Sequence, residues 1–166
     1  MRLHRNRLTT LLTIGVFVVG AALYIWTSAR QKESAKILSA LDRFDALEKE
    51  HSQRFEKIKK LGRCVQEERG LLIIRSFNPV LQPPYFEKSK NQLSEIAYVL
   101  DLALEQSYYV ISAIAYGLDK LQENPDNHYD ELAEQLLKSL DELIAKAETA
   151  LKKYQESIAP NQKPPR

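Results

Sequence analysis

The sequence predicts an all-α protein in which a single N-terminal transmembrane helix precedes an antiparallel, coiled-coil-like three-helix bundle. The first observation is an uncharged run of nineteen positions, residues 8–26. The second is that apolar residues elsewhere recur at spacings of three and four, which is typical of amphipathic helices. The third is that, before the proline-rich tail at 159–166, only two segments, 76–84 and 124–127, contain the proline and asparagine clusters that end helices. No stretch of the sequence alternates as a β-strand would.

Residues 8–26 form the predicted transmembrane helix, because a run of this length crosses a hydrocarbon core of about 30 Å. The preceding segment 1–7 contains three arginines and no acid, so the positive-inside rule predicts a cytoplasmic N-terminus and an extracytoplasmic body. We expect a single-pass protein of the bacterial inner membrane whose body faces the periplasm. The predicted membrane-interface anchors are Arg5, Arg7, Tyr24 and Trp26.

Two other interpretations of the N-terminus remain open. One is a cleaved secretory signal, with small residues for the protease at 20–22 or 27–29. An uncleaved signal anchor is favoured, because cleavage after Ala22 would leave an apolar new terminus and the later site would need an unusually long apolar core. The other is an arginine-rich, acid-free organelle-targeting segment, which is less natural before a full membrane span.

The bundle is predicted at residues 30–158, with helices at about 30–75, 84–123 and 125–158, followed by a disordered, proline-rich tail at 159–166. One face of the first helix carries the apolar residues Ile37, Leu41, Phe44, Leu47, Phe55, Ile58, Leu61 and Val65. No helix breaker separates this helix from Trp26, so the membrane helix is predicted to continue into it.

The second helix is predicted to be the central element, because two apolar rows cover most of its circumference. A heptad seam contains Leu93, Ala97, Leu100, Leu104, Ser107, Ile111, Ile114, Leu118 and Leu121. A second row contains Ile96, Val99, Ala103, Val110 and Ala113. Asp101 and Glu105 fall near the middle of this apolar stretch. Because charges there would be costly in a bilayer, a second membrane span is rejected.

The third helix is predicted to begin near Asn124 or Asn127, either of which can cap a helix. Its seam contains Leu132, Leu136, Leu140, Leu143, Ala147, Leu151 and Tyr154. Short connections make neighbouring helices antiparallel, and the facing residue numbers of the first two helices then sum to about 159. This register places Gly62 opposite Ala97, where two small residues permit close packing, and Arg54 opposite Glu105.

The distribution of charge favours pairing between the helices and argues against nucleic-acid binding. Residues 30–75 hold 12 basic and 8 acidic residues, whereas residues 84–158 hold 7 and 14, so opposite charge is expected to guide helix pairing. Residues 30–166 hold 21 basic and 22 acidic residues in total. The basic character therefore belongs to the membrane anchor, and no nucleic-acid partner is expected.

No catalytic, cofactor-binding or metal-binding residue is predicted. The chain lacks a nucleophile–base motif, a glycine-rich phosphate loop and a dinucleotide fingerprint, and its histidines lack zinc-site spacing. His51 is interpreted as a hydrogen-bonded core residue, and Cys64 as a packed thiol rather than a bridge to a second copy. Favourable placement at a helix start explains Asp126, His128, Asp130 and Glu131 better than a hard cation does.

A polar strip on the central helix is the candidate partner- or ligand-facing site. With Ser94 at its start, the strip consists of Tyr98, Asp101, Glu105, Tyr108, Ser112 and Tyr116, which recur every three or four residues and share one face. It is either the solvent side of the helix or a recognition surface rich in tyrosine. Asp101 and Glu105 repel one another unless a cation neutralises them, either Arg54 or Lys57 from within or a partner from outside.

These features predict a non-enzymatic, membrane-anchored envelope adaptor or scaffold that acts through protein–protein contacts. A homodimer covering the second apolar row of the central helix, or a different protein on a helical face, is the expected partner. In layout alone the chain resembles phage inner-membrane spanins. A second hypothesis is a sensory bundle, which resembles the external domains of chemoreceptors and would need a separate membrane partner and an unknown small ligand. The third is a cleaved, soluble exported bundle.

Overall fold

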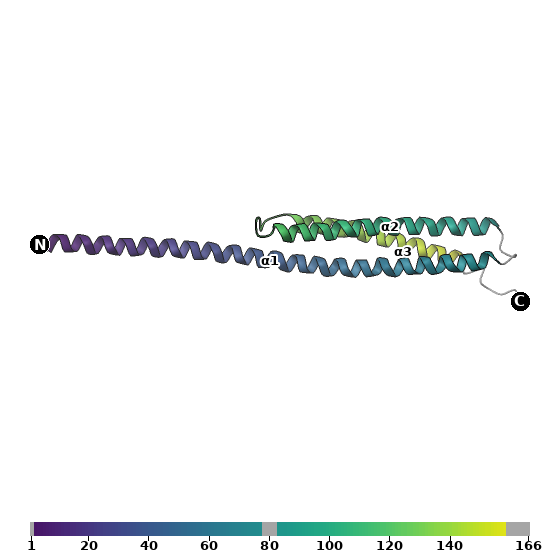
Figure 1. Cartoon of the computed structure of the whole chain (residues 1–166), viewed down its shortest axis with the longest axis horizontal. Helices are drawn as coiled ribbons and strands as arrows, with labels where there is room; N and C mark the ends of the chain where they lie inside the picture. The colour runs from purple at the N-terminus through teal and green to yellow at the C-terminus, as the bar shows by residue number, and fades with distance from the viewer. Residues whose placement is uncertain (1, 78–82, 159–166) are drawn as a thin grey trace.

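Three long helices make up the computed structural model, which describes residues 2–77 and 83–158, with side chains described from 23 to 77 and from 85 to 158. They are α1 (Arg2–Ser76), α2 (Pro83–Lys120) and α3 (Tyr129–Ile158). Figure 1 shows the second half of α1 packed beside α2 and α3 along their length. The all-α bundle is therefore confirmed, and no strand occurs in the described part of the chain.

Helix α1 runs without a break from Arg2 to Ser76, as the absence of a breaker after Trp26 predicted. Near the turn between α2 and α3, an ion pair joins Lys36 of α1 to Asp126, whose Nζ and Oδ2 atoms lie 2.8 Å apart. Figure 1 shows the chain before this point projecting alone beyond the bundle. At about 1.5 Å per residue, this single helix extends about 50 Å.

The expected membrane span lies mostly outside the residues whose side chains the structure describes. In the ranges 23–77 and 85–158, no helical stretch is both long and apolar enough to cross a bilayer. The expected span at 8–26 falls largely on residues 1–22, and the expected disordered tail at 159–166 also lies outside the described residues. At the outer end of the expected span, the side chains of Tyr24 and Trp26 are exposed.

The core is formed by apolar residues from all three helices, including Phe44 of α1, Leu93 of α2 and Leu140 of α3. In α2 the whole second row, from Ile96 to Ala113, is buried within the bundle. The expectation that a second copy covers this row is therefore wrong, because α1 and α3 cover it. The second row lies at the centre of the face that α2 presents to α1 and α3. Two residues of the heptad seam, Leu104 and Ile111, therefore lie at the edge of this face, and their exposed fractions are 43% and 36%.

Ion pairs join α1 to α3, which run in the same direction. Besides Lys36 with Asp126, they connect Arg43 with Asp130, Arg54 with Asp141 and Lys57 with Glu148. The sequence separation is 87 residues for Arg54–Asp141 and again 87 for the Gln155–Glu68 hydrogen bond. The basic first helix is thus matched by acids as its charge predicted, but these acids come from α3 and the connection before it rather than from α2.

The predicted register between α1 and α2 is confirmed by one hydrogen bond and corrected in one detail. Nε2 of His51 lies 2.7 Å from Oγ of Ser107, in agreement with the predicted facing positions. Gly62 and Ala97 line the same groove. The close packing expected there is wrong, since a Cβ atom on Gly62 would meet nothing within 4 Å. Ile58 and Val65, which line the same groove, are buried.

Candidate functional site

The polar strip predicted on the central helix lies on the outer surface of α2. Tyr98, Tyr108 and Tyr116 are exposed by 64%, 67% and 49%. Asp101 and Glu105 are exposed between these rings, and Ser112 is half-buried. Because residues three and four apart on a helix are neighbours, the six residues form one continuous surface, which we call the tyrosine strip. The other predicted site residues, Arg5 and Arg7, lie outside the described side chains.

Contacts within α2 hold parts of the tyrosine strip in place. The hydroxyl of Tyr109 donates a hydrogen bond to Oε1 of Glu105 at 3.1 Å, and this bond raises the pKa of Tyr109. The hydroxyl of Ser112 donates to the backbone carbonyl of Tyr108 at 2.8 Å. Sequence reasoning missed Tyr109, although its spacing of four from Glu105 is the signal that identifies such a pair.

At the end next to the connection between α2 and α3, the tyrosine strip continues onto α3. The ring of Tyr116 packs edge-on against the ring of Tyr129 with their centroids 4.8 Å apart. Nζ of Lys120 lies 6.0 Å from the centroid of Tyr116, close enough for a weak cation–π contact. This end of the strip is therefore anchored by packing, whereas Tyr98 and Tyr108 project further into solvent.

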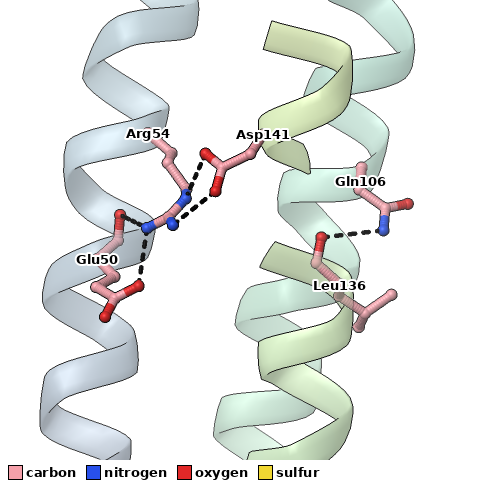
Figure 2. A network of polar contacts seen from close by, with 5 residues as sticks. All are labelled: Glu50, Arg54, Gln106, Leu136 and Asp141. Atoms are coloured by element: carbon pink, nitrogen blue, oxygen red, sulfur yellow. Dashed lines mark hydrogen bonds and ion pairs between the residues drawn. The ribbon is translucent and has the colours of Figure 1, made fainter. Parts of the chain in front are cut away.

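The basic residues expected to neutralise Asp101 and Glu105 face α3 instead. Figure 2 shows the guanidinium of Arg54 between Asp141 and Glu50. Its Nε and Nη2 donate to the two carboxylate oxygens of Asp141 at 2.8 Å each, and Nη1 donates to Oε2 of Glu50 at 3.0 Å. The Asp141 carboxylate raises the pKa of Arg54. The predicted pairing of Arg54 with Glu105 is therefore wrong.

Lys57 also turns away from the strip, since its Nζ lies 3.0 Å from Oε1 of Glu148. Figure 2 also shows a separate hydrogen bond between α2 and α3, in which Nε2 of Gln106 donates to the carbonyl oxygen of Leu136 at 3.3 Å. Within the described residues, neither Asp101 nor Glu105 has an oppositely charged group within 4.0 Å. The two acids of the strip thus face outward without an internal cation.

His51 lies half-buried between α1 and α2 and is hydrogen-bonded, as its position on an apolar face predicted. Its Nε2 is 2.7 Å from the hydroxyl and 3.1 Å from the carbonyl oxygen of Ser107. Burial lowers the pKa of His51, partly opposed by the Ser107 carbonyl and Glu48 and assisted by Arg54. The folded protein therefore favours the neutral imidazole.

The depressed pKa of His51 predicts a loss of stability at mildly acidic pH. The unfolded chain takes up a proton near pH 6.5 before the folded chain does, so stability is present above this pH and falls as the pH drops through the lower folded pKa. We expect the urea midpoint to fall less between pH 7 and 5 in His51→Gln than in the parent chain. His128→Gln, at the exposed His128, should keep the parental pH dependence. If the urea midpoint fell by the same amount between pH 7 and 5 in all three proteins, this role of His51 would be wrong.

The acids near the start of α3 form ion pairs with α1. Asp126 contacts Lys36, and the buried Asp130 lies 2.6 Å from Nη1 of Arg43. In the part of the chain with described side chains, no group of three or more potential metal ligands comes together. The amide of Tyr129 donates to Oδ1 of Asn127 at 3.4 Å, so Asn127 caps the helix as one of the two predicted candidates. These charges therefore join the middle of α1 to the start of α3 and to the connection before it.

Cys64 is a free thiol that lies half-buried against the core, in the packed position that its neighbouring apolar residues favoured.

Comparison of the chain with protein-family models, curated proteins and solved structures gave no match.

Proposed function

We propose that the protein is a single-span membrane-anchored adaptor whose helical body docks on another protein through the tyrosine strip of α2. The N-terminus is cytoplasmic and the body lies on the extracytoplasmic side, as the arginines of residues 1–7 favour. The body contributes contacts and position rather than catalysis.

The observation that carries this proposal is the continuity of α1. A helix in water is stabilised mainly by packing its apolar face against another part of the protein, and it keeps charged or polar residues on the face toward solvent. Residues 8–26 have no charged residue on any side of the helix. Because this part of α1 projects beyond the bundle (Figure 1), a lipid bilayer is the environment that suits it. The exposed Tyr24 and Trp26 then fall at the membrane–water boundary.

An unbroken helix fixes the height of the docking surface above the membrane. By the register between α1 and α2, Tyr116 lies level with the region of Arg43 and Tyr98 level with the region of Leu61. At about 1.5 Å per residue, the tyrosine strip spans roughly 25 to 50 Å from Trp26. Tyrosine supplies large contact area with a hydroxyl group, and such residues are enriched in protein interfaces. A partner with cationic side chains would complement Asp101 and Glu105.

Photo-crosslinking in intact membranes tests this docking surface. A photoreactive amino acid replaces Tyr98 or Tyr116 in the full-length chain, and Glu142, which is exposed on α3, is the control position. We expect both α2 positions to capture one and the same protein, with little capture at Glu142. If neither α2 position captures a protein, or if the control captures the same set equally well, docking through the tyrosine strip is wrong.

A further inference from the structure

The end of α1 exposes apolar side chains on the face that points to solvent. Leu72 faces the core and is 5% exposed, whereas its apolar neighbours Leu71, Ile73, Ile74 and Phe77 are exposed by 44% to 82%. The amide of Phe77 donates to the carbonyl of Ile74 at 3.3 Å, so Phe77 continues the helical course. At about 100° per residue, the four exposed positions form one arc on the side of the helix opposite Leu72. We call these four residues the apolar tip.

The character of this side of α1 changes abruptly at Gly70. In the preceding turns the same side carries exposed charged residues, including Lys60, Arg63 and Glu67, as the solvent side of a bundle helix normally does. After Gly70 the members of the apolar tip occupy that side alone. A contiguous apolar surface of this kind is typical of a site that contacts a protein or a membrane.

The apolar tip lies at the end of the bundle farthest from the N-terminus, together with the start of α2 and the end of α3 (Figure 1). Helix α1 is unbroken from Arg2 to Ser76. At about 1.5 Å per residue, the apolar tip therefore stands about 75 Å from Trp26. It points away from the membrane in which the proposed anchor lies.

This end of the bundle is basic, whereas the rest of the bundle is acidic. Residues 67–77, 83–90 and 151–158, which lie at this end, hold 6 basic and 4 acidic residues. Residues 30–66 and 91–150 hold 13 basic and 18 acidic residues. The excess of positive charge around the apolar tip is complementary to an anionic surface, and the charge of the rest of the bundle is not.

The cations of this end lie next to the apolar tip, and its acids lie further away. Arg69 and Arg75 flank the tip along α1, and residues 69–86 contain no acid. Among the described residues, neither arginine has an oppositely charged group within 4.0 Å. Glu68 turns toward α3, where its Oε1 accepts a hydrogen bond from Nε2 of Gln155 at 3.4 Å. The exposed acids of this end are Glu67, Glu87 and Glu156.

We propose that the apolar tip inserts into a second lipid surface, one that carries anionic headgroups. Helices that lie at a bilayer interface combine aliphatic and phenyl groups, which enter the acyl boundary, with Lys or Arg, which binds anionic lipids. Unlike the tyrosine strip, the apolar tip offers no hydrogen-bonding side chain, which suits acyl chains better than a protein surface. This inference rests on the proposed function in one respect. With residues 8–26 in one membrane, the apolar tip holds the second about 75 Å away along α1.

Capture of vesicles tests the apolar tip in the full-length chain. The chain is reconstituted in phosphatidylcholine vesicles, which are mixed with dense, sucrose-loaded vesicles of phosphatidylcholine and phosphatidylglycerol. Sedimentation then measures how much of the protein-bearing population the dense vesicles carry down. We expect Ile74→Ser with Phe77→Ser to weaken capture at least about tenfold, because two apolar side chains lose their burial in lipid. Arg69→Gln with Arg75→Gln should weaken capture at least about fivefold, because two cations near the anionic surface are lost.

Leu38→Ser with Leu132→Ser is the matched control, because it removes two exposed apolar side chains elsewhere on α1 and α3 and should leave capture unchanged. Circular dichroism of each variant verifies that its helices are intact. No capture by the parent chain, or equal capture by dense vesicles of phosphatidylcholine alone, would overturn the proposal. Clustering of the protein-bearing vesicles in the absence of dense vesicles would identify a second copy as the occupant, and would overturn it as well.

Flotation of the protein-bearing vesicles alone reports the anchor separately. A chain that floats but captures no anionic vesicle contradicts only the role of the apolar tip. A chain that does not float contradicts the proposed membrane anchor. In that case direct sedimentation of the chain with the dense anionic vesicles still tests the apolar tip, with the same variants and the same expected losses.

Discussion

Gly117→Val is expected to destabilise the bundle by about 2–3 kcal/mol, at the upper end of the usual cost of overpacking a core. A Cβ atom at Gly117 would overlap the ring of Phe44 and come within 2.8 Å of Cβ of Tyr129. Phe44 is 2% exposed, so its ring has little room to move. All three helices therefore meet at this point because residue 117 has no side chain.

The matched substitution is Gly70→Val, where an added Cβ would meet nothing within 4 Å. This variant should stay within about 0.5 kcal/mol of the parent, because removing a glycine from a helix interior is not unfavourable. Urea unfolding of the full chain in detergent micelles, followed by far-ultraviolet circular dichroism, gives both free energies of unfolding. Adding Phe44→Leu to Gly117→Val should recover part of the loss. Equal stability of the two glycine variants would show that the helices do not approach closely at Gly117.

The sequence predicted the number of helices, the continuity of α1 and the α1–α2 register, because helical periodicity and short connections determine these features. It did not predict the neighbour of Arg54. Periodicity places Arg54 at the edge of the stripe of α1 that faces the core. The third helix can pack on either side of the first two, which gives a left-handed or a right-handed bundle, and the handedness decides which flank of α1 the third helix contacts. Arg54 consequently binds Asp141 of α3 rather than facing Glu105 of α2.

The outward orientation of the tyrosine strip followed from spacing, whereas the groove did not. Two small residues at the same level, Gly62 and Ala97, suggested close packing of α1 and α2. An added Cβ atom at Gly62 would instead meet nothing within 4 Å, because the distance between two helices depends on the volumes of all the side chains packed between them and not on one pair of small residues. The burial of the second apolar row of α2 was missed for a related reason, since one helix can present two rows to two different neighbours.

Val16→Asp is expected to have the largest effect on the protein as a whole, because it places a carboxylate near the middle of residues 8–26. A central aspartate costs about 3 kcal/mol on insertion scales, which corresponds to a factor on the order of 100 in membrane partition. We expect this variant to lose most of its membrane-bound fraction. Ser34→Asp makes the same charge change at an exposed position outside the apolar run, and it should remain membrane-bound.

Carbonate extraction of cell membranes, followed by N-terminal sequencing of the extracted chain, tests the anchored adaptor most directly. The parent and the Ser34→Asp chains should stay in the membrane pellet with residues 8–26 still attached, while Val16→Asp appears in the supernatant. A parent chain found in the soluble fraction with Leu23 or Arg30 as its first residue would contradict the anchor, and would identify the protein as a soluble exported bundle.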